Sequence, residues 1–203
     1  MAGYRGPKHQ VSRREGVNLT GTSSRSLQRR LGAPPGVHGQ ARPRRQSEYG
    51  RQLREKQRLK RHFGMSEKQF HRAFEDAQRT DEPTGQALLR LLEARLDNVV
   101  YRLGFAPTRP MARQLVNHGH VLANGRRVDI PSYRVEPGDT IALSERAAGI
   151  PAVEESLHGG RVRPPSWLAR EGDQPIGRVL QRPLPEEMDI PVDVDQIVTF
   201  YAR

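Results

Sequence analysis

Residues 108–129 carry the local signals that most constrain how this chain can fold. Thr108 is a suitable helix N-cap, and Pro110 falls in the first helical turn, where a missing N–H costs little because that donor has no intrahelical partner. Apolar side chains then recur at helical spacing, at Met111, Ala112, Leu115 and Val116. Gly119 comes just past this stripe, where helices commonly end in a left-handed conformation. The pattern predicts a short helix that ends near His118.

A tight hairpin is predicted directly after this helix. Residues 124–125 are Asn-Gly, which favours the two positive-φ positions of a type I′ turn, and short apolar segments flank them. Arg126 and Arg127 follow the turn, while Arg109 and Arg113 lie opposite the apolar stripe of the helix. We therefore expect four guanidinium groups to gather on one small surface, where they could bind phosphate oxygens bidentately.

The composition indicates an anionic partner. The 203 residues have a formal net charge of +11, a sequence pI of about 10.9 and a mean hydropathy of −0.78, as nucleic-acid-binding proteins commonly do. Arginine supplies 30 of the 34 basic residues, and phosphate recognition and a coding bias toward arginine explain this ratio equally well. Without cysteine, the chain can form neither disulfides nor thiolate zinc sites.

Other classes of protein find little support in the sequence. No apolar run is long enough to span a membrane, and the first ten residues lack the apolar segment of a secretory signal. No P-loop, nucleophile elbow, dinucleotide fingerprint or zinc-binding histidine pattern occurs. We therefore expect a soluble, cytoplasmic, non-enzymatic protein with no cofactor, no small-molecule substrate and no membrane partner.

Positive charge is concentrated in the N-terminal third of the chain. Residues 1–72 hold 18 basic against 4 acidic side chains, residues 73–150 hold 10 against 10, and residues 151–203 hold 6 against 9. Residues 1–45 combine this charge with Gly, Pro and Ser and show no apolar periodicity, which predicts an extended arm that becomes ordered along RNA. A disordered solubility tail is the alternative. The RNA contacts expected in the arm are Arg13, Arg14, Arg44 and Arg45.

The next segment is predicted to form a basic helix from Ser47 to Phe63, ended by Gly64. Within the helix only Glu48 and Glu55 oppose its positive charge, so phosphates are expected to relieve the repulsion. The basic side chains are Arg51, Arg54, Lys56, Arg58, Lys60 and Arg61.

Further elements are expected along the rest of the chain. A capping box at residues 66–69 opens a scaffold helix, residues 81–85 form a linker, and residues 86–103 form one long core helix. Within that helix, Arg95 and Asp97 are interpreted as salt-bridge or capping groups and not as an active site.

The C-terminal half is predicted to contribute more strands. Short strands at 133–135 and 140–143 would complete a small sheet. Residues 145–173 look loose, with Trp167 packing against the body and not stacking on bases. Alternating apolar residues over 190–201 predict a terminal strand that returns to the N-terminal region.

Four stretches carry a family resemblance. Residues 91–105, LLEARLDNVVYRLGF, and 112–139, ARQLVNHGHVLANGRRVDIPSYRVEPGD, resemble the RNA-binding module of the bacterial S-four family of small-subunit ribosomal proteins. Residues 6–16, GPKHQVSRREG, and 34–64, PPGVHGQARPRRQSEYGRQLREKQRLKRHFG, resemble the same family outside the module. The similarity covers most of the chain except roughly residues 145–190.

The resemblance implies an α+β fold in which a small module of helices and a short β-sheet is inserted into a mostly helical domain, with a C-terminal strand packing back. In these terms residues 1–45 form the arm, 46–90 a helical rRNA-binding domain completed by 160–203, 91–155 the module, and 156–203 the returning C-terminal segment. Many relatives hold a zinc ion or a cluster through cysteines in the arm, whereas this chain has serines there, so we predict no metal.

The resemblance also implies a function. The chain would bind the 5′ domain of small-subunit rRNA, nucleate assembly of the subunit body, and contribute to translational accuracy with proteins S-five and S-twelve. Neighbouring ribosomal proteins, especially S-five, and mRNA where it enters the subunit would be further partners. Matching positions imply RNA contacts on the basic helix and on the module: Arg51, Arg54, Lys56, Arg58, Arg61, Arg109, Arg113, Gln114, Asn117, His118, His120, Asn124, Arg126 and Arg127.

Two other functions use the same module. An RNA-modifying enzyme or synthetase would carry it as an anchor, but would need a larger catalytic domain than residues 145–203 offer. A free-standing RNA-binding factor would not require the basic arm and helix.

Overall fold

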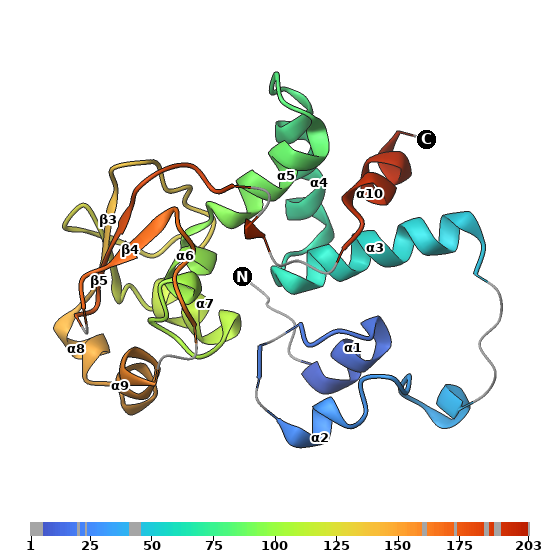
Figure 1. Ribbon diagram of the computed structural model, residues 1–203, viewed down its shortest axis with the longest axis horizontal. Helices are drawn as coiled ribbons and strands as arrows, with labels where there is room; N and C mark the ends of the chain where they lie inside the picture. The colour runs from blue at the N-terminus through green and yellow to red at the C-terminus, as the bar shows by residue number, and fades with distance from the viewer. Residues whose placement is uncertain are drawn as a thin grey trace. The chain divides into compact units, whose positions relative to one another are not determined.

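A computed structural model of the chain describes residues 6–19, 21–22, 24–40, 46–159, 162–172, 174–184, 187–188 and 192–202. The described residues form two compact units (Figure 1): a helical unit of residues up to 85 with residues 192–202, and an α+β unit of residues 86–188. The predicted α+β class is confirmed. Arg44 and Arg45 lie outside the described residues.

The helical unit is built on α3, which begins and ends where the sequence predicted. Its elements are α1 (Lys8–Glu15), α2 (Arg25–Gln28), the 3₁₀ helix η1 (Val37–Gln40), α3 (Glu48–His62), α4 (Glu67–Gln78) and α10 (Val194–Tyr201). The Ser47 hydroxyl accepts the Gly50 N–H at 3.2 Å at the start of α3. The predicted capping box opens α4, since Ser66 and Gln69 exchange hydrogen bonds at 3.2 and 3.3 Å.

The described part of the N-terminal arm is folded and not extended. α1 ends at Gly16, whose φ of 70° is the left-handed conformation that favours glycine. Leu19 and Leu27 are buried, and so is the carboxylate of Glu15. A few isolated apolar side chains and one buried carboxylate therefore stabilise this segment. The sequence has no apolar periodicity here, so it did not predict that the segment folds.

The terminal strand predicted over residues 190–201 is wrong, because residues 194–201 form the helix α10. Asp193 caps this helix by accepting the Gln196 N–H at 3.3 Å. Ile197 is fully buried, and α10 runs beside α3 (Figure 1). The apolar residues of this segment fit the spacing of a helix as well as that of a strand. Packing against α3 favours the helix.

The α+β unit contains a five-stranded antiparallel sheet with the strand order β2-β1-β3-β5-β4. Its helices are α5 (Thr84–Glu93, which begins in the helical unit), α6 (Leu96–Arg102), α7 (Arg109–Asn117), α8 (Glu145–Ala148) and α9 (Pro151–His158). Its strands are β1 (Val121–Ala123), β2 (Arg126–Val128), β3 (Thr140–Leu143), β4 (Leu168–Arg170) and β5 (Ile176–Val179).

The single core helix predicted over residues 86–103 is also wrong. The chain breaks between α5 and α6 at Arg95, which has an extended ψ of 137°. At this break the Leu96 N–H donates to the Tyr133 carbonyl at 2.8 Å, and the Val135 N–H donates to the Ala94 carbonyl at 2.9 Å. The segment predicted as a strand at 133–135 thus forms an isolated bridge to the break, and pairing between distant segments overrides the local apolar period.

The hairpin is confirmed, because Asn124 and Gly125 have φ of 50° and 75° between β1 and β2. Residues 145–173 are more regular than predicted, since they supply α8, α9 and β4, and β5 follows them. The resemblance assigned residues 168–179 to a segment returning to the N-terminal domain. In the structure they extend the sheet of the α+β unit, because β5 pairs with β3 and β4 pairs with β5. Gly177 permits this because a Cβ there would lie only 2.5 Å from the side chain of Leu103.

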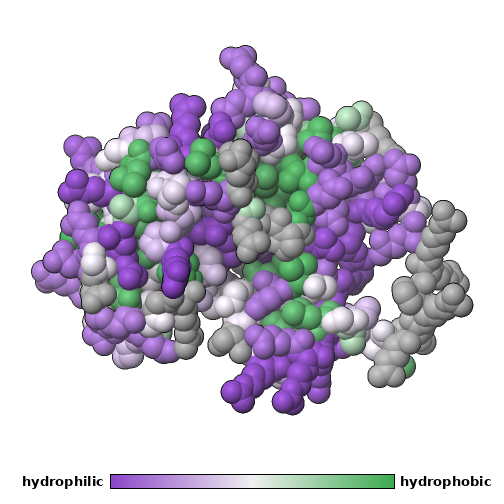
Figure 2. All heavy atoms as spheres, in the orientation of Figure 1, coloured by the Kyte–Doolittle hydropathy of each residue, from purple (hydrophilic) through white to green (hydrophobic). Residues whose placement is uncertain are grey.

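The core of the α+β unit includes Trp167, which is 1% exposed, as predicted for a packing role. Hydrophilic side chains, in contrast, lie along α3 and α2 on the face shown in Figure 2. None of the described helices is long and apolar enough to cross a membrane.

Candidate nucleic-acid interface

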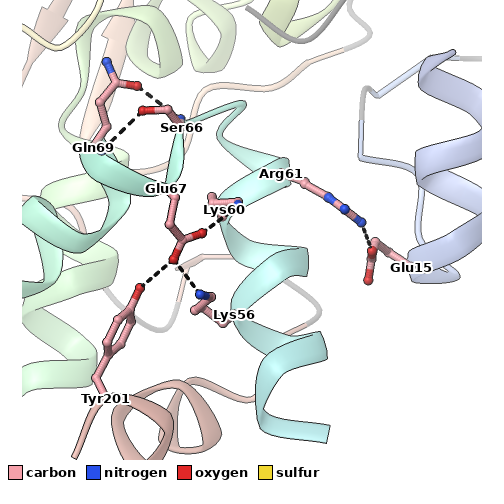
Figure 3. A network of polar contacts seen from close by, with 8 residues as sticks. All are labelled: Glu15, Lys56, Lys60, Arg61, Ser66, Glu67, Gln69 and Tyr201. Atoms are coloured by element: carbon pink, nitrogen blue, oxygen red, sulfur yellow. Dashed lines mark hydrogen bonds and ion pairs between the residues drawn. The ribbon is translucent and has the colours of Figure 1, made fainter. Parts of the chain in front are cut away.

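Acidic side chains from neighbouring elements neutralise part of the basic helix α3. Glu67 of α4 accepts from Lys56 at 2.5 Å and from Lys60 at 2.7 Å (Figure 3). Lys56 is buried and its ammonium lies 4.6 Å from the ring centroid of Phe200. Lys56, which we expected to contact RNA, is therefore an internal cation that joins α3 to α4 and α10.

The same network perturbs two ionisable groups. Burial acts to raise the pKa of Glu67, but the ammonium groups of Lys56 and Lys60 outweigh it and lower the pKa below its usual range. Burial and the nearby carboxylate raise the pKa of Tyr201, whose hydroxyl lies 3.4 Å from Glu67. Glu67 therefore stays ionised and Tyr201 stays neutral at physiological pH.

Glu15 connects α1 to α3. Its carboxylate is fully buried and pairs with Arg54 at 3.4 Å. It also pairs with Arg61, as Figure 3 shows. Arg58 pairs with Glu55 of its own helix at 2.7 Å. Sequence reasoning missed this role of Glu15, although one signal was available: it is the only acidic residue among the first 47.

Five arginines line a hollow of about 860 Å³ in the helical unit, which we call the arginine hollow. Arg13 and Arg14 come from α1, and Arg51, Arg54 and Arg58 come from α3. Arg14 and Arg51 are exposed, and their guanidinium groups form no hydrogen bond or ion pair with other described residues. Arg13 donates to the carbonyls of Ala33 at 2.9 Å and Pro34 at 3.1 Å, which fix its guanidinium without cancelling the charge.

In the α+β unit, two of the four predicted surface arginines are engaged by the protein itself. Arg113 donates to Asp97 at 2.5 and 2.7 Å, and the same carboxylate pairs with Arg95 at 3.0 Å. Arg109 lies 4.4 Å from the Tyr101 ring centroid and donates to Asn98 at 3.0 Å. Burial lowers the pKa of Arg109. The interpretation of Arg95 and Asp97 as a salt bridge is confirmed.

The hairpin and the end of α7 present the remaining predicted groups. Gln114, Asn117, His118, Arg126 and Arg127 are exposed, and the guanidinium of Arg127 lies over Gly119 at the end of α7. His120 is half-buried beside Ser144, 3.5 Å from its hydroxyl. The Asn124 side chain is used by the fold, since it donates to Asp139 at 2.7 Å and accepts the Thr140 N–H at 2.9 Å.

The predicted residues thus divide between exposed cations and cations held by internal carboxylates. The exposed group includes Arg14, Arg51, Arg126 and Arg127; the internal group includes Lys56 and Arg113. Among the described residues, no three His, Asp or Glu side chains cluster so that they could hold a metal ion.

The fold and these surfaces define a class of protein: a basic helical unit joined to a small α+β unit, each presenting arginines suited to a polyanion. Two family models match the chain, the S4 domain over residues 94–141 and the ribosomal protein S4/S9 N-terminal domain over residues 3–93.

Full-length relatives identify the family. The chain is 46% identical over 203 residues to the small ribosomal subunit protein uS4 of Brevibacillus brevis, 49% over 211 residues to that of Herpetosiphon aurantiacus, and 50% over 206 residues to that of Persephonella marina. Each match covers 100% of both chains. The chain therefore belongs to the family of the small ribosomal subunit protein uS4.

Proposed function

We propose that this chain is a primary rRNA-binding, non-enzymatic protein of the small ribosomal subunit and resides there in the cytoplasm. The observation that carries the proposal is the set of exposed arginines without a carboxylate partner among the described residues: Arg14, Arg51, Arg126 and Arg127. Phosphates are the ligands that guanidinium groups bind best in RNA. The family membership supports the same function.

The RNA contacts proposed on the helical unit centre on the arginine hollow. On the α+β unit they centre on Arg126, Arg127 and the exposed end of α7, with Gln114, Asn117 and His118 as neutral donors. Arg44 and Arg45 remain predicted contacts of the arm. Because A-form RNA hides its base edges in a narrow major groove, these groups would recognise phosphates, 2′-hydroxyls and the shape of a helix junction.

The finer assignments follow the family resemblance. The proposed target is the 5′ domain of small-subunit rRNA, where binding would nucleate the subunit body. Proteins S-five and S-twelve would be the neighbours through which the chain affects translational accuracy, and mRNA would pass near it on entering the subunit.

Binding to separate rRNA transcripts tests this function. The purified chain should bind a 5′-domain transcript far more tightly than a 3′-domain transcript of equal length, and its affinity should fall steeply with salt. Equal affinity for the two transcripts would contradict the proposed target. Against the alternative of a free-standing factor, the chain should stay with small subunits sedimented after a high-salt wash.

A further inference from the structure

The hairpin between β1 and β2 carries a chemically reactive dipeptide. Asn124 is the only one of the four asparagines in the chain that is followed by glycine. In an Asn-Gly sequence the backbone nitrogen of the glycine can attack the asparagine amide, because glycine has no side chain to hinder the approach. Asn124 and Gly125 are exposed, and no heavy atom outside the adjacent residues lies within 4 Å of the place where a Cβ of Gly125 would be. Burial and steric crowding therefore do not block this reaction.

Hydrogen bonds to the start of β3, in contrast, hold the Asn124 amide in place. Its Oδ1 accepts the Thr140 N–H at 2.9 Å, and its Nδ2 donates to the Asp139 carboxylate at 2.7 Å. The Asn124 backbone N–H also donates to the Thr140 carbonyl at 2.8 Å. Deamidation expels Nδ2 and takes the amide carbon toward the Gly125 nitrogen. The reaction therefore requires that the side chain of Asn124 first leave these partners.

The carboxylate that holds Asn124 is itself fixed by the sheet. Asp139 Oδ2 accepts the Glu136 N–H at 2.9 Å, and the Asp139 carbonyl accepts the Val179 N–H of β5 at 2.9 Å. The position of Asn124 therefore depends on the pairing of β3 with β5 as well as on the hairpin.

We propose that Asn124 is a site of non-enzymatic deamidation that the folded α+β unit protects through the hydrogen bonds of the Asn124 amide to Asp139 and Thr140. The site becomes reactive when these bonds are lost, and the modification then marks chains whose hairpin has separated from β3. This inference goes beyond the proposed function, and its principal tests do not involve RNA.

The reaction consumes only water. The deprotonated backbone nitrogen of Gly125 forms a bond to Cγ of Asn124, the Cγ–Nδ2 bond breaks, and Nδ2 takes up a proton from water and leaves as ammonia. Water then opens the resulting succinimide ring by breaking one of the bonds between the ring nitrogen and a carbonyl carbon. Cleavage at Cγ gives aspartate. Cleavage at the main-chain carbonyl gives isoaspartate, in which the main chain runs through the side-chain carbons.

Either product changes the hairpin. Aspartate places a carboxylate against that of Asp139, so that a hydrogen bond is replaced by repulsion between like charges. Isoaspartate lengthens the main chain within the turn that aligns β1 with β2. Both products lack the donor Nδ2, so the original contact with Asp139 does not form again.

Ageing of the purified full chain at mildly alkaline pH tests whether the fold protects the site. Trypsin cleavage after Arg113 and Arg126, under brief and mildly acidic conditions, releases residues 114–126, which contain both Asn117 and Asn124. Mass spectrometry of this peptide should show much slower deamidation of Asn124 in the folded chain than in the same chain in guanidinium chloride. Asn117, which is exposed and followed by histidine, is the internal reference and should react slowly in both samples. Equal rates for Asn124 in the folded and the unfolded chain would overturn the proposal.

Substitution of the aspartate tests the mechanism of protection. Asp139→Ala should speed the deamidation of Asn124 in the folded chain by about two- to tenfold, because loss of one hydrogen bond raises the population of the open hairpin by about that factor. Asp129→Ala removes a carboxylate just after β2 and leaves both side-chain bonds of Asn124 in place, so this matched control should age like the wild type. An unchanged or slower rate in Asp139→Ala would overturn the protective role of Asp139.

A variant that weakens the same unit elsewhere distinguishes local opening from global unfolding. Arg113→Ala removes an ion pair with Asp97 and leaves the hydrogen bonds of Asn124 in place. Its Asn124 should deamidate at nearly the wild-type rate. If Arg113→Ala and Asp139→Ala accelerate the reaction in proportion to their loss of stability in urea, deamidation follows global unfolding and the proposed local protection is wrong.

The consequence for RNA binding rests on the proposed function. Chains aged in guanidinium chloride and refolded should bind the 5′-domain transcript more weakly than fresh chains treated in the same way, because deamidation adds negative charge beside Arg126 and Arg127. Asn124→Gly cannot deamidate at this position and tolerates the positive φ, so it should lose no affinity on ageing. If deamidated and fresh wild type bind equally well, the modification site stands and the hairpin is not an RNA contact.

Discussion

The buried carboxylate of Asp97 provides the most quantitative test of this structure. Its side chain is 6% exposed and pairs with Arg95, 7% exposed, through distances of 3.1 and 3.0 Å. Arg113, 22% exposed, shares the same carboxylate. Asp97→Ala would therefore leave Arg95 as a buried cation with no counter-charge among the residues that the structure describes, whereas Arg113→Ala would leave the Arg95–Asp97 pair intact.

The two substitutions should differ in magnitude. Removing one partner of a buried pair costs about 3–5 kcal/mol, because the remaining charge stays desolvated. Removing Arg113 costs about 1.5–3 kcal/mol, since it deletes charge-assisted hydrogen bonds but leaves no buried charge without a partner. Arg178→Ala, which breaks an exposed pair with Glu171, should change the free energy of unfolding by less than about 1 kcal/mol.

Urea unfolding followed by the fluorescence of Trp167 measures these differences directly. Trp167 is the only tryptophan in the chain and is buried in the core of the same unit as Asp97. A common m-value would show that the same surface is exposed in each variant. If Asp97→Ala is no less stable than Arg113→Ala, the assignment of Asp97 as the central counter-charge is incorrect.

Three further outcomes are expected. Arg127→Ala should lower the salt slope of rRNA binding by about 0.7–0.9, whereas folded Arg113→Ala should change that slope little; equal slopes for both variants and the wild type would exclude the hairpin from the contact. Since the folded-state pKa of Glu67 is depressed, its stabilising contribution is present above about pH 4.3 and is lost as pH falls through the folded-state value. Thermal melting followed by circular dichroism should therefore show a smaller acid-induced loss of stability in Glu67→Gln than in the wild type. Asn124→Ala should destabilise the α+β unit by about 1–3 kcal/mol, because alanine is strained at a φ of 50° and two side-chain hydrogen bonds are lost. Asn124→Gly should recover part of this loss in the same urea assay, because glycine adopts that φ without strain.

Local chemistry determined much of this protein in advance. The capping box at Ser66, the start of α3 at Ser47 and the Asn-Gly turn each depend on atoms within a few residues, so the sequence was sufficient to predict them. The high net charge and the clustering of arginines likewise indicated an anionic partner before any fold was known.

Only the tertiary structure decided which cations face outward. Glu15 lies on α1 and Glu67 lies on α4, whereas the cations that they neutralise lie on α3. The spacing rules for residues of one helix therefore cannot predict these ion pairs. Long-range pairing also broke the expected helix at Arg95 and brought β4 and β5 into the sheet. Burial and ion pairing act between segments that the fold brings together. Sequence periodicity depends only on neighbours along the chain. The distribution of exposed charge therefore follows from the tertiary structure and could not be predicted from the sequence.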